Sequence, residues 1–106
     1  MSDWQDLGAI ANFPPDRITP VRVAGEDLVV VRRGDELACF RDRCSHQDVR
    51  LSEFGEILAS KLVCHAHGAE FDCLSGRHLS MPATAPLEAV PIELRDGTLF
   101  IDRDEV

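Results

Sequence analysis

The most informative part of the sequence is residues 44–67, CSHQDVRLSEFGEILASKLVCHAH. It begins with Cys44-Ser45-His46 and ends with Cys64-His65-Ala66-His67, so a cysteine is closely followed by a histidine in two places. Residues 47–63 separate the two pairs. Thiolate and imidazole are both metal ligands, and two such pairs on separate loops can converge on one site. We therefore predict a metal centre held by this segment.

The order of the cysteine and histidine ligands along the chain helps to distinguish between kinds of metal centre. A structural zinc site usually groups its ligands by type, with two cysteines close together and two histidines close together. Here each loop supplies one cysteine and one histidine. This mixed order suits a site with two irons, because each loop can place its thiolate on one iron and its imidazole on the other, with two bridging sulfides completing the coordination. A structural zinc-binding module for protein interaction is the alternative.

The segments on either side predict short antiparallel strands joined by tight turns. Glycine supplies the positive φ that such turns need, and it occurs in Ala24-Gly25, Arg33-Gly34 and Asp96-Gly97. Apolar and β-branched residues surround these turns, and they predict strands within residues 18–23, 28–31, 37–41, 89–94 and 99–101. The fold class is therefore all-β.

Residues 44–86 have a different character from the rest of the chain. They are rich in Cys, His, Gly and Pro and show little sustained periodicity, apart from a possible short helix around residues 49–54. A long irregular segment inside a compact domain is uncommon unless it is functional. We predict one domain, residues 1–106, in which a loop-rich subdomain at roughly 42–86 is inserted in a β base.

Length and charge restrict the partners. The chain has 106 residues, with 11 Lys and Arg, 19 Asp and Glu, and a formal net charge of −8. Nucleic acids and anionic membranes favour a basic surface, so we expect neither as a partner. No apolar run approaches the ~20 residues of a membrane span, and no basic stretch followed by an apolar one marks a secretory signal. We expect a cytoplasmic monomer.

Two further cysteines lack a neighbouring histidine of this kind. Cys39 lies between Ala38 and Phe40 on an expected strand, and Cys73 follows Phe71-Asp72. In a reducing cytosol they are poor candidates for a disulfide, and we predict that both are packed as small apolar side chains. Asp42, by contrast, lies beside the first ligand pair, where we expect it to influence partner recognition.

The two ligand pairs together resemble the motif of the Rieske family, C-x-H followed by C-x-x-H, and the chain is most similar to the small Rieske-type ferredoxins. Leu51-Ser52-Glu53-Phe54-Gly55 is similar to the leucine-serine stretch after the first histidine. His67-Gly68-Ala69-Glu70-Phe71-Asp72 resembles the H-G-x-x-F-D run after the second, and Pro82-Ala83 and Pro86-Leu87 resemble the proline-bearing loop that covers the cluster. The resemblance extends roughly over residues 21–101.

This resemblance implies a Rieske-type fold of antiparallel sheets that binds one [2Fe-2S] cluster. Cys44 and Cys64 would ligate one iron, and His46 and His67 would ligate the other. It also implies a surface for docking partners around the cluster, formed by Gln47, Asp48, His65, Ala66, Gly68 and Pro82.

The function implied is electron transport without catalysis by the protein itself. The carrier would take one electron from a flavin-containing NAD(P)H ferredoxin reductase and pass it to a terminal Rieske oxygenase. Such an oxygenase is typically an aromatic-ring-hydroxylating dioxygenase of aromatic hydrocarbon catabolism. The alternative within the family is the small Rieske-like subunit of an NAD(P)H-dependent nitrite reductase.

Several positions depart from the family pattern. His65 stands where the family usually has Pro, and we expect its side chain to face solvent; the alternative is that it competes as a ligand, although its place next to Cys64 makes the second iron awkward to reach. Val49 and Ala66 stand where the respiratory-complex branch has two disulfide-forming cysteines, so that disulfide cannot form here. Ala69 and Phe71 stand where the same branch has a Ser and a Tyr that donate hydrogen bonds to the cluster.

The last of these departures predicts a low midpoint potential. Hydrogen bonds to the cluster sulfurs stabilise the electron-rich reduced state, and Ala69 and Phe71 cannot donate them. We expect a potential near the lower end of the Rieske range of about −150 to +300 mV. A redox titration of the purified protein measures it, and a midpoint well above zero would contradict this expectation.

Overall fold

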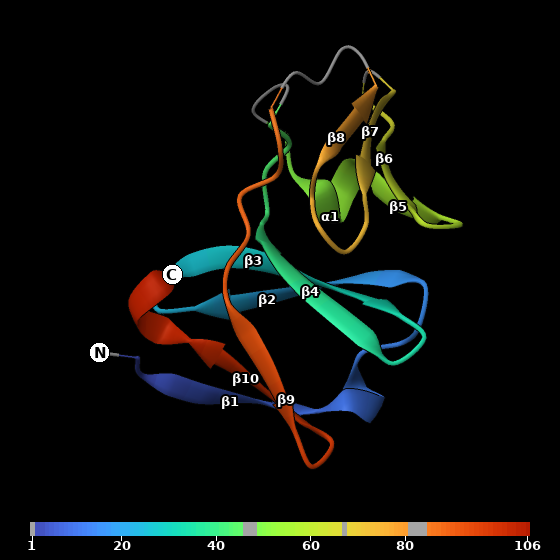
Figure 1. Cartoon of the computed structure of the whole chain (residues 1–106). Coiled ribbons are helices and arrows are strands. Elements are labelled where there is room, and N and C mark those ends of the chain that lie inside the picture. Colours follow the sequence, from blue (N-terminus) through green and yellow to red (C-terminus); the bar gives the residue numbers. More distant parts are fainter. Residues whose placement is uncertain (1, 46–48, 67, 81–84) are drawn as a thin grey trace.

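The computed structural model describes residues 2–45, 49–66, 68–80 and 85–106. Three antiparallel sheets lie within these ranges, in the orders β1-β10-β9, β2-β3-β4 and β5-β6-β7-β8 (Figure 1). The first sheet consists of β1 (Trp4–Ala9), β9 (Ile92–Arg95) and β10 (Thr98–Asp102). The second consists of β2 (Arg17–Val23), β3 (Glu26–Arg33) and β4 (Glu36–Arg41). The third consists of β5 (Gly55–Leu58), β6 (Lys61–Cys64), β7 (Ala69–Asp72) and β8 (His78–Ser80).

Three short helical segments complete the described elements: η1 (Ile10–Asn12), α1 (Leu51–Phe54) and η2 (Arg103–Glu105). In the described part of the chain, none of the helices has the length and apolar character of a membrane span. The third sheet and α1 lie together at one end of the molecule, and the two termini lie away from that end, along one side of the first and second sheets (Figure 1). The all-β architecture of antiparallel sheets predicted from the sequence is confirmed.

The second sheet is the middle layer of the molecule, and its strand β3 is apolar on both faces. Successive residues of a strand point to opposite faces. Leu28 and Val30 accordingly pack in a core shared with the first sheet, whereas Val29 and Val31 pack in a core shared with the third. All four side chains are completely buried. This explains the unbroken apolar run, which is typical of strands covered on both sides.

The predicted turns are present and have the expected backbone conformation. Gly34 joins β3 to β4 with a φ of +62°, and Asp96 and Gly97 join β9 to β10 with φ of +49° and +78°. Ala24 and Gly25 likewise join β2 to β3 with positive φ. Two consecutive residues with positive φ match the right-handed twist of the flanking strands.

Residues 55–80 differ from the sequence-based expectation of an irregular region, because they contain the third sheet. Each of its strands has only three or four residues, which is too short for an alternating pattern to stand out. The short helix expected around residues 49–54 is present as α1. Strand β1 was also not predicted; it pairs with β10 along the edge of the first sheet.

The segment 85–90 connects the two ends of the molecule and is fastened to both. The Leu87 N–H donates to the Gly76 carbonyl (2.8 Å) below the third sheet, and the Arg41 N–H donates to the Glu88 carbonyl (2.9 Å). The Val90 N–H then donates to the Cys39 carbonyl (2.9 Å). This segment therefore fixes the third sheet relative to β4.

Gly76 offers a direct test of this packing. Its φ is +77°, and a Cβ added there would lie 2.6 Å from a ring carbon of Phe40. We expect Gly76→Ala to lower the free energy of unfolding by about 3 kcal/mol, since backbone strain adds to overpacking. Gly34→Ala is the control, because Gly34 also has positive φ but has open space around it, and it should cost about 1 kcal/mol. Equal losses in chemical denaturation would contradict the packing described.

Candidate metal centre

Cys44 is presented by the chain as it leaves β4. The Cys44 N–H donates to the Val49 carbonyl (3.0 Å), which folds the first loop back on itself. Leu51, at the start of α1, is completely buried and anchors the far side of this loop. The Cys44 side chain is itself only 1% exposed. The first cysteine is thus held between the end of one strand and the start of a helix.

Cys64 is the last residue of β6, and it is paired on both sides. Gly55 of β5 and Ala69 of β7 lie opposite it in the sheet register. The turn that follows is closed by the Gly68 N–H, which donates to the Cys64 carbonyl (2.8 Å). The His65 N–H donates to the Phe54 carbonyl (2.8 Å), so the second loop is tied to the end of α1. The usual family residue at position 65, proline, could not make this bond.

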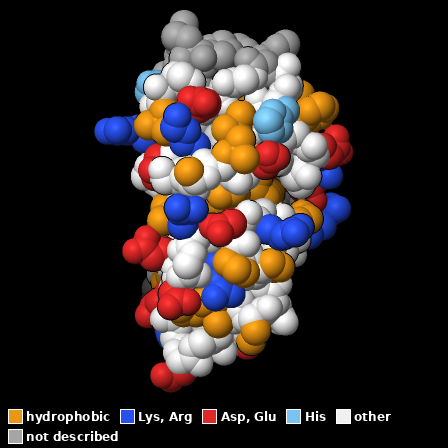
Figure 2. Space-filling model, turned by 90° about the vertical axis from the view of Figure 1, so that its right-hand side faces the viewer, with side chains coloured by type: hydrophobic (Ala, Val, Ile, Leu, Met, Phe, Trp, Pro, Cys, Tyr) orange, Lys and Arg blue, Asp and Glu red, His pale blue; other side chains and the backbone are white. Residues whose placement is uncertain are grey.

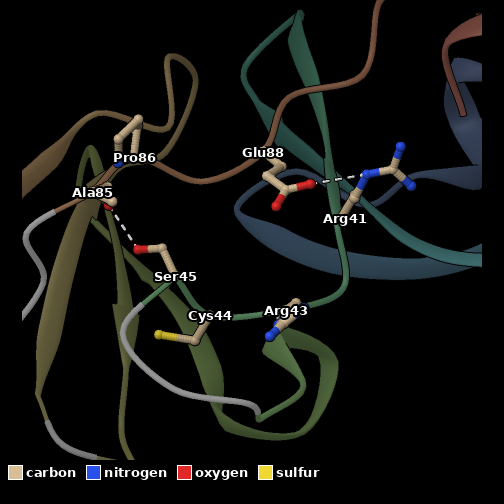
Figure 3. A pocket seen from close by; sticks show the side chains of 7 residues that line it. All are labelled: Arg41, Arg43, Cys44, Ser45, Ala85, Pro86 and Glu88. Carbon is tan, nitrogen blue, oxygen red and sulfur yellow. Dashed lines mark hydrogen bonds and ion pairs between the residues drawn. The ribbon is translucent and has the colours of Figure 1, made fainter.

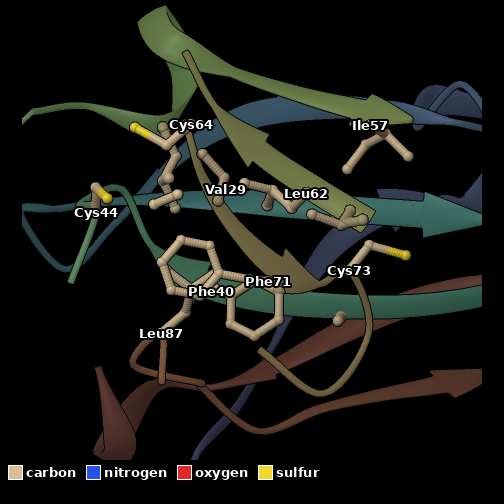
Figure 4. Packing of buried hydrophobic residues seen from close by; sticks show 13 residues of the cluster. Val29, Phe40, Cys44, Ile57, Leu62, Cys64, Phe71, Cys73 and Leu87 are labelled. Carbon is tan, nitrogen blue, oxygen red and sulfur yellow. The ribbon is translucent and has the colours of Figure 1, made fainter. Parts of the chain in front are cut away.

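The two cysteine side chains meet at the edge of the core. Their thiols lie close enough to affect each other's protonation, and the Ala66 backbone amide acts on the Cys64 sulfur as a hydrogen-bond donor. Figure 4 shows both at the same end of the apolar cluster, with Cys73 at the opposite end. Burial raises the pKa of the Cys64 thiol; the Ala66 hydrogen bond lowers it, and the adjacent Cys44 thiol raises it again. A bound metal ion reverses this balance, since a coordinating thiol loses its proton.

His46 and His67, the two predicted imidazole ligands, lie outside the described residues. Among the residues that the structure does describe, no group of three or more His, Cys, Asp or Glu side chains is gathered as for a metal ion. The described part of the predicted site is therefore the thiol pair and its surroundings.

Cys39 and Cys73 are packed side chains, as predicted. Cys39 is 2% exposed and faces the core between the first and second sheets, away from the other thiols. Burial raises its pKa to about 12, although Arg41 lowers it slightly. Cys73 is 1% exposed, and burial raises its pKa as well. Neither thiol is in a state to react near neutral pH.

The apolar wall beside the thiols contains no hydroxyl at the two positions singled out in the sequence. Ala69 and Phe71 alternate on β7, and both are completely buried in the core that contains Cys44 and Cys64. Ala69 is the direct cross-strand neighbour of Cys64. Neither side chain can donate a hydrogen bond to a sulfur.

His65 faces solvent, as expected. Its side chain is 54% exposed, and its Nε2 lies 3.7 Å from a carboxylate oxygen of Glu56. Ala66 is partly buried and Gly68 is exposed, whereas the other three residues of the predicted docking surface, Gln47, Asp48 and Pro82, lie outside the described residues. Figure 2 shows acidic and basic side chains interspersed on the face that it displays, without a large area of one sign.

Asp42 does not have the role expected for it. Its side chain is buried rather than available to a partner, and both of its oxygens accept hydrogen bonds from Ser52. The sequence gives no clear sign of this contact, because the two residues are ten positions apart and no short motif joins them.

A second contact of the first loop was also missed by sequence reasoning. The Ser45 hydroxyl donates to the Ala85 carbonyl (2.6 Å), which links the loop to the segment 85–90 (Figure 3). A pocket of about 250 Å³ opens beside this contact, lined by Arg41, Arg43, Cys44, Ser45, Ala85, Pro86 and Glu88. Arg41 is held by Glu88 through a 3.0 Å ion pair, so one wall of the pocket is fixed.

Comparison with known proteins assigns this arrangement to a family. The model of the Rieske [2Fe-2S] domain matches residues 3–91. The chain belongs to the Rieske family. Its cofactor is accordingly one Rieske-type [2Fe-2S] cluster, and the resemblance recognised in the sequence is confirmed.

Known relatives and solved structures are similar to this chain over nearly its whole length. The anthranilate 1,2-dioxygenase ferredoxin subunit of Burkholderia cepacia is 36% identical over 103 residues, 96% of this chain and 94% of the relative. Ferredoxin CarAc of Metapseudomonas resinovorans is 31% identical over 99 residues, 92% of each. A chain in the complex of reduced oxygenase and oxidized ferredoxin in carbazole 1,9a-dioxygenase is 30% identical, with a TM-score of 0.83 over 97% of this chain and 95% of that one.

The described residues fit a Rieske cluster. Two buried thiols in contact, an amide that donates to one of the sulfurs and an apolar wall behind them form one side of such a site. Thiolates are the ligands that iron–sulfur clusters require, and hydrogen bonds to their sulfurs are a common feature of these sites.

Proposed function

We propose that this protein carries single electrons from a flavin-containing NAD(P)H ferredoxin reductase to a terminal Rieske oxygenase, of the aromatic-ring-hydroxylating dioxygenase kind. The observation that carries the proposal is the meeting of the Cys44 and Cys64 thiols in a chain that matches dioxygenase ferredoxins from end to end. One relative is named as a ferredoxin subunit of anthranilate 1,2-dioxygenase, and one similar chain belongs to an oxygenase–ferredoxin complex.

We assign Cys44 and Cys64 as the ligands of one iron, and His46 and His67 as the ligands of the other. The cluster supplies one-electron chemistry when it is bound. The protein's part is to hold the ligands and exclude water from the sulfurs. Cys44 and Cys64, both 1% exposed, and the apolar side chains behind them meet this requirement.

The third sheet, in which β6 ends at Cys64, lies at the end of the molecule remote from both termini (Figure 1). A carrier needs its redox centre near a surface that a partner can approach. His65 and Gly68 are exposed there, and we assign them to the docking surface. Such transient redox complexes bury small areas, below about 1,200 Å².

We further propose that the protein is not itself an enzyme, that it functions as a monomer in the cytoplasm, and that residues 42–86 form its cluster-binding subdomain. The relative named as a ferredoxin subunit of a dioxygenase supports the first of these. The exchange of partners expected of a carrier favours the second.

Replacing the ligands tests their assignment. We expect Cys44→Ala, Cys64→Ala and His67→Ala each to abolish the Rieske electron paramagnetic resonance signal, because an iron loses a ligand. Cys73→Ala is the matched control: it removes a buried thiol from the same core, and we expect it to retain a full cluster. A normal signal in any of the three ligand variants would show that the assignment is wrong.

The proposed function is tested by reconstitution. The purified protein is mixed with a flavin-dependent ferredoxin reductase, NADH and a terminal Rieske oxygenase with its aromatic substrate, and product formation is followed. We expect turnover to depend on this protein and to stop with Cys44→Ala. Reduction of the protein without onward transfer to any oxygenase, combined with transfer to a nitrite reductase, would contradict the proposal.

A further inference from the structure

Asp42 is one of two charged residues that are buried in the described part of the chain; the other is Asp102. The Ser52 N–H donates to Oδ1 of Asp42 (2.8 Å), and the Ser52 hydroxyl donates to Oδ2 (2.6 Å). Both oxygens therefore act as acceptors, as in an ionised carboxylate. A buried charge is costly unless it is paired in this way, so its presence calls for a reason.

The contact between Asp42 and Ser52 closes the first ligand loop. The chain between them contains Cys44 and His46. Asp27, at β3, holds both sides of the same loop: its carbonyl accepts from the Asp42 N–H (3.0 Å), and its carboxylate accepts from the Arg50 guanidinium. Asp27 thus fixes both ends of the loop to the middle sheet, at Asp42 and at Arg50. The hydrogen bonds between Asp42 and Ser52 join the two ends to each other.

The carboxylate also lies only two positions before Cys44 in the chain, in a poorly solvated environment. A negative charge near a redox centre opposes the addition of an electron, and this effect is stronger away from water. Asp42 therefore has two separable properties: hydrogen bonds that hold the loop, and a charge that affects the electron affinity of the site.

We propose that Asp42 is a positioning residue for the cluster, which fixes the first ligand loop through Ser52 and lowers the midpoint potential through its charge. This inference rests on the proposed ligands Cys44 and His46. It adds to the effect of Ala69 and Phe71, because those residues fail to stabilise the reduced state whereas Asp42 actively disfavours it.

Three variants separate the two properties. Asp42→Asn removes the charge but keeps an acceptor and a donor for Ser52. Ser52→Ala keeps the charge and the backbone hydrogen bond but removes the hydroxyl. Asp102→Asn is the matched control, since Asp102 is also buried and also accepts from backbone amides, those of Asp3 and Asp104, but it lies in β10 in the first sheet.

The measurements use the cluster-loaded protein and need no partner. The midpoint potential is obtained by redox titration, and cluster retention by the rate at which the visible absorbance is lost in a chelator. We expect Asp42→Asn to raise the potential. We expect Ser52→Ala to leave it unchanged or lower, while the cluster is lost up to about tenfold faster, the effect of one charge-assisted hydrogen bond. Asp102→Asn should change neither quantity.

The possible outcomes distinguish this inference from the proposed function. An unchanged or lower potential in Asp42→Asn, or the same rise in Asp102→Asn, would overturn the effect assigned to the charge. Wild-type retention in Ser52→Ala would overturn the loop-holding role. Failure of electron transfer to an oxygenase, with these potentials as expected, would instead contradict the proposed function alone. A wild-type protein without a cluster would overturn both the ligand assignment and the inference built on it.

Discussion

The contact between the Cys44 and Cys64 thiols is the constraint on which the rest of the structure depends. The two cysteines are in different parts of the chain, one after β4 and one at the end of β6, and both side chains must reach the same point at the edge of the core. Two neutral thiols in an apolar environment stabilise each other little, because a thiol is a weak hydrogen-bond donor and acceptor. Burial also raises the pKa of Cys64, which favours the neutral form. Their proximity is accounted for by a shared metal centre, which takes both as thiolates.

The middle sheet makes this meeting possible. Because β3 is apolar on both faces, β4 beside it is also covered on both sides, and it directs Phe40 toward the third sheet and Cys39 toward the first. The alternation of side chains along β4 thus explains why Cys39 is a buried core residue, whereas the chain just beyond β4 carries Cys44, the proposed ligand. The segment 85–90 then holds the third sheet in place by hydrogen bonds to Gly76 and Arg41.

The sequence predicted correctly those features that depend on a few adjacent residues. The paired Cys and His residues predicted the cofactor, and Gly34 and Asp96-Gly97 predicted their hairpins, because ligand spacing and positive φ are properties of a few adjacent residues. It failed where the determining contact is remote in sequence. The strands of the third sheet are too short to show a period, and the burial of Asp42 depends on Ser52, which no pattern connects to it. The ligand roles of Cys44, His46, Cys64 and His67 stay predictions.

The most direct measurement is the metal and acid-labile sulfide content of the protein, purified without oxygen and compared with its chain concentration. We predict two irons and two sulfides per chain, with no zinc, because two thiolates and two imidazoles leave room for two bridging sulfides between two irons. One zinc per chain without sulfide would contradict it, since the same four donors would then form a closed tetrahedral site that carries no electron.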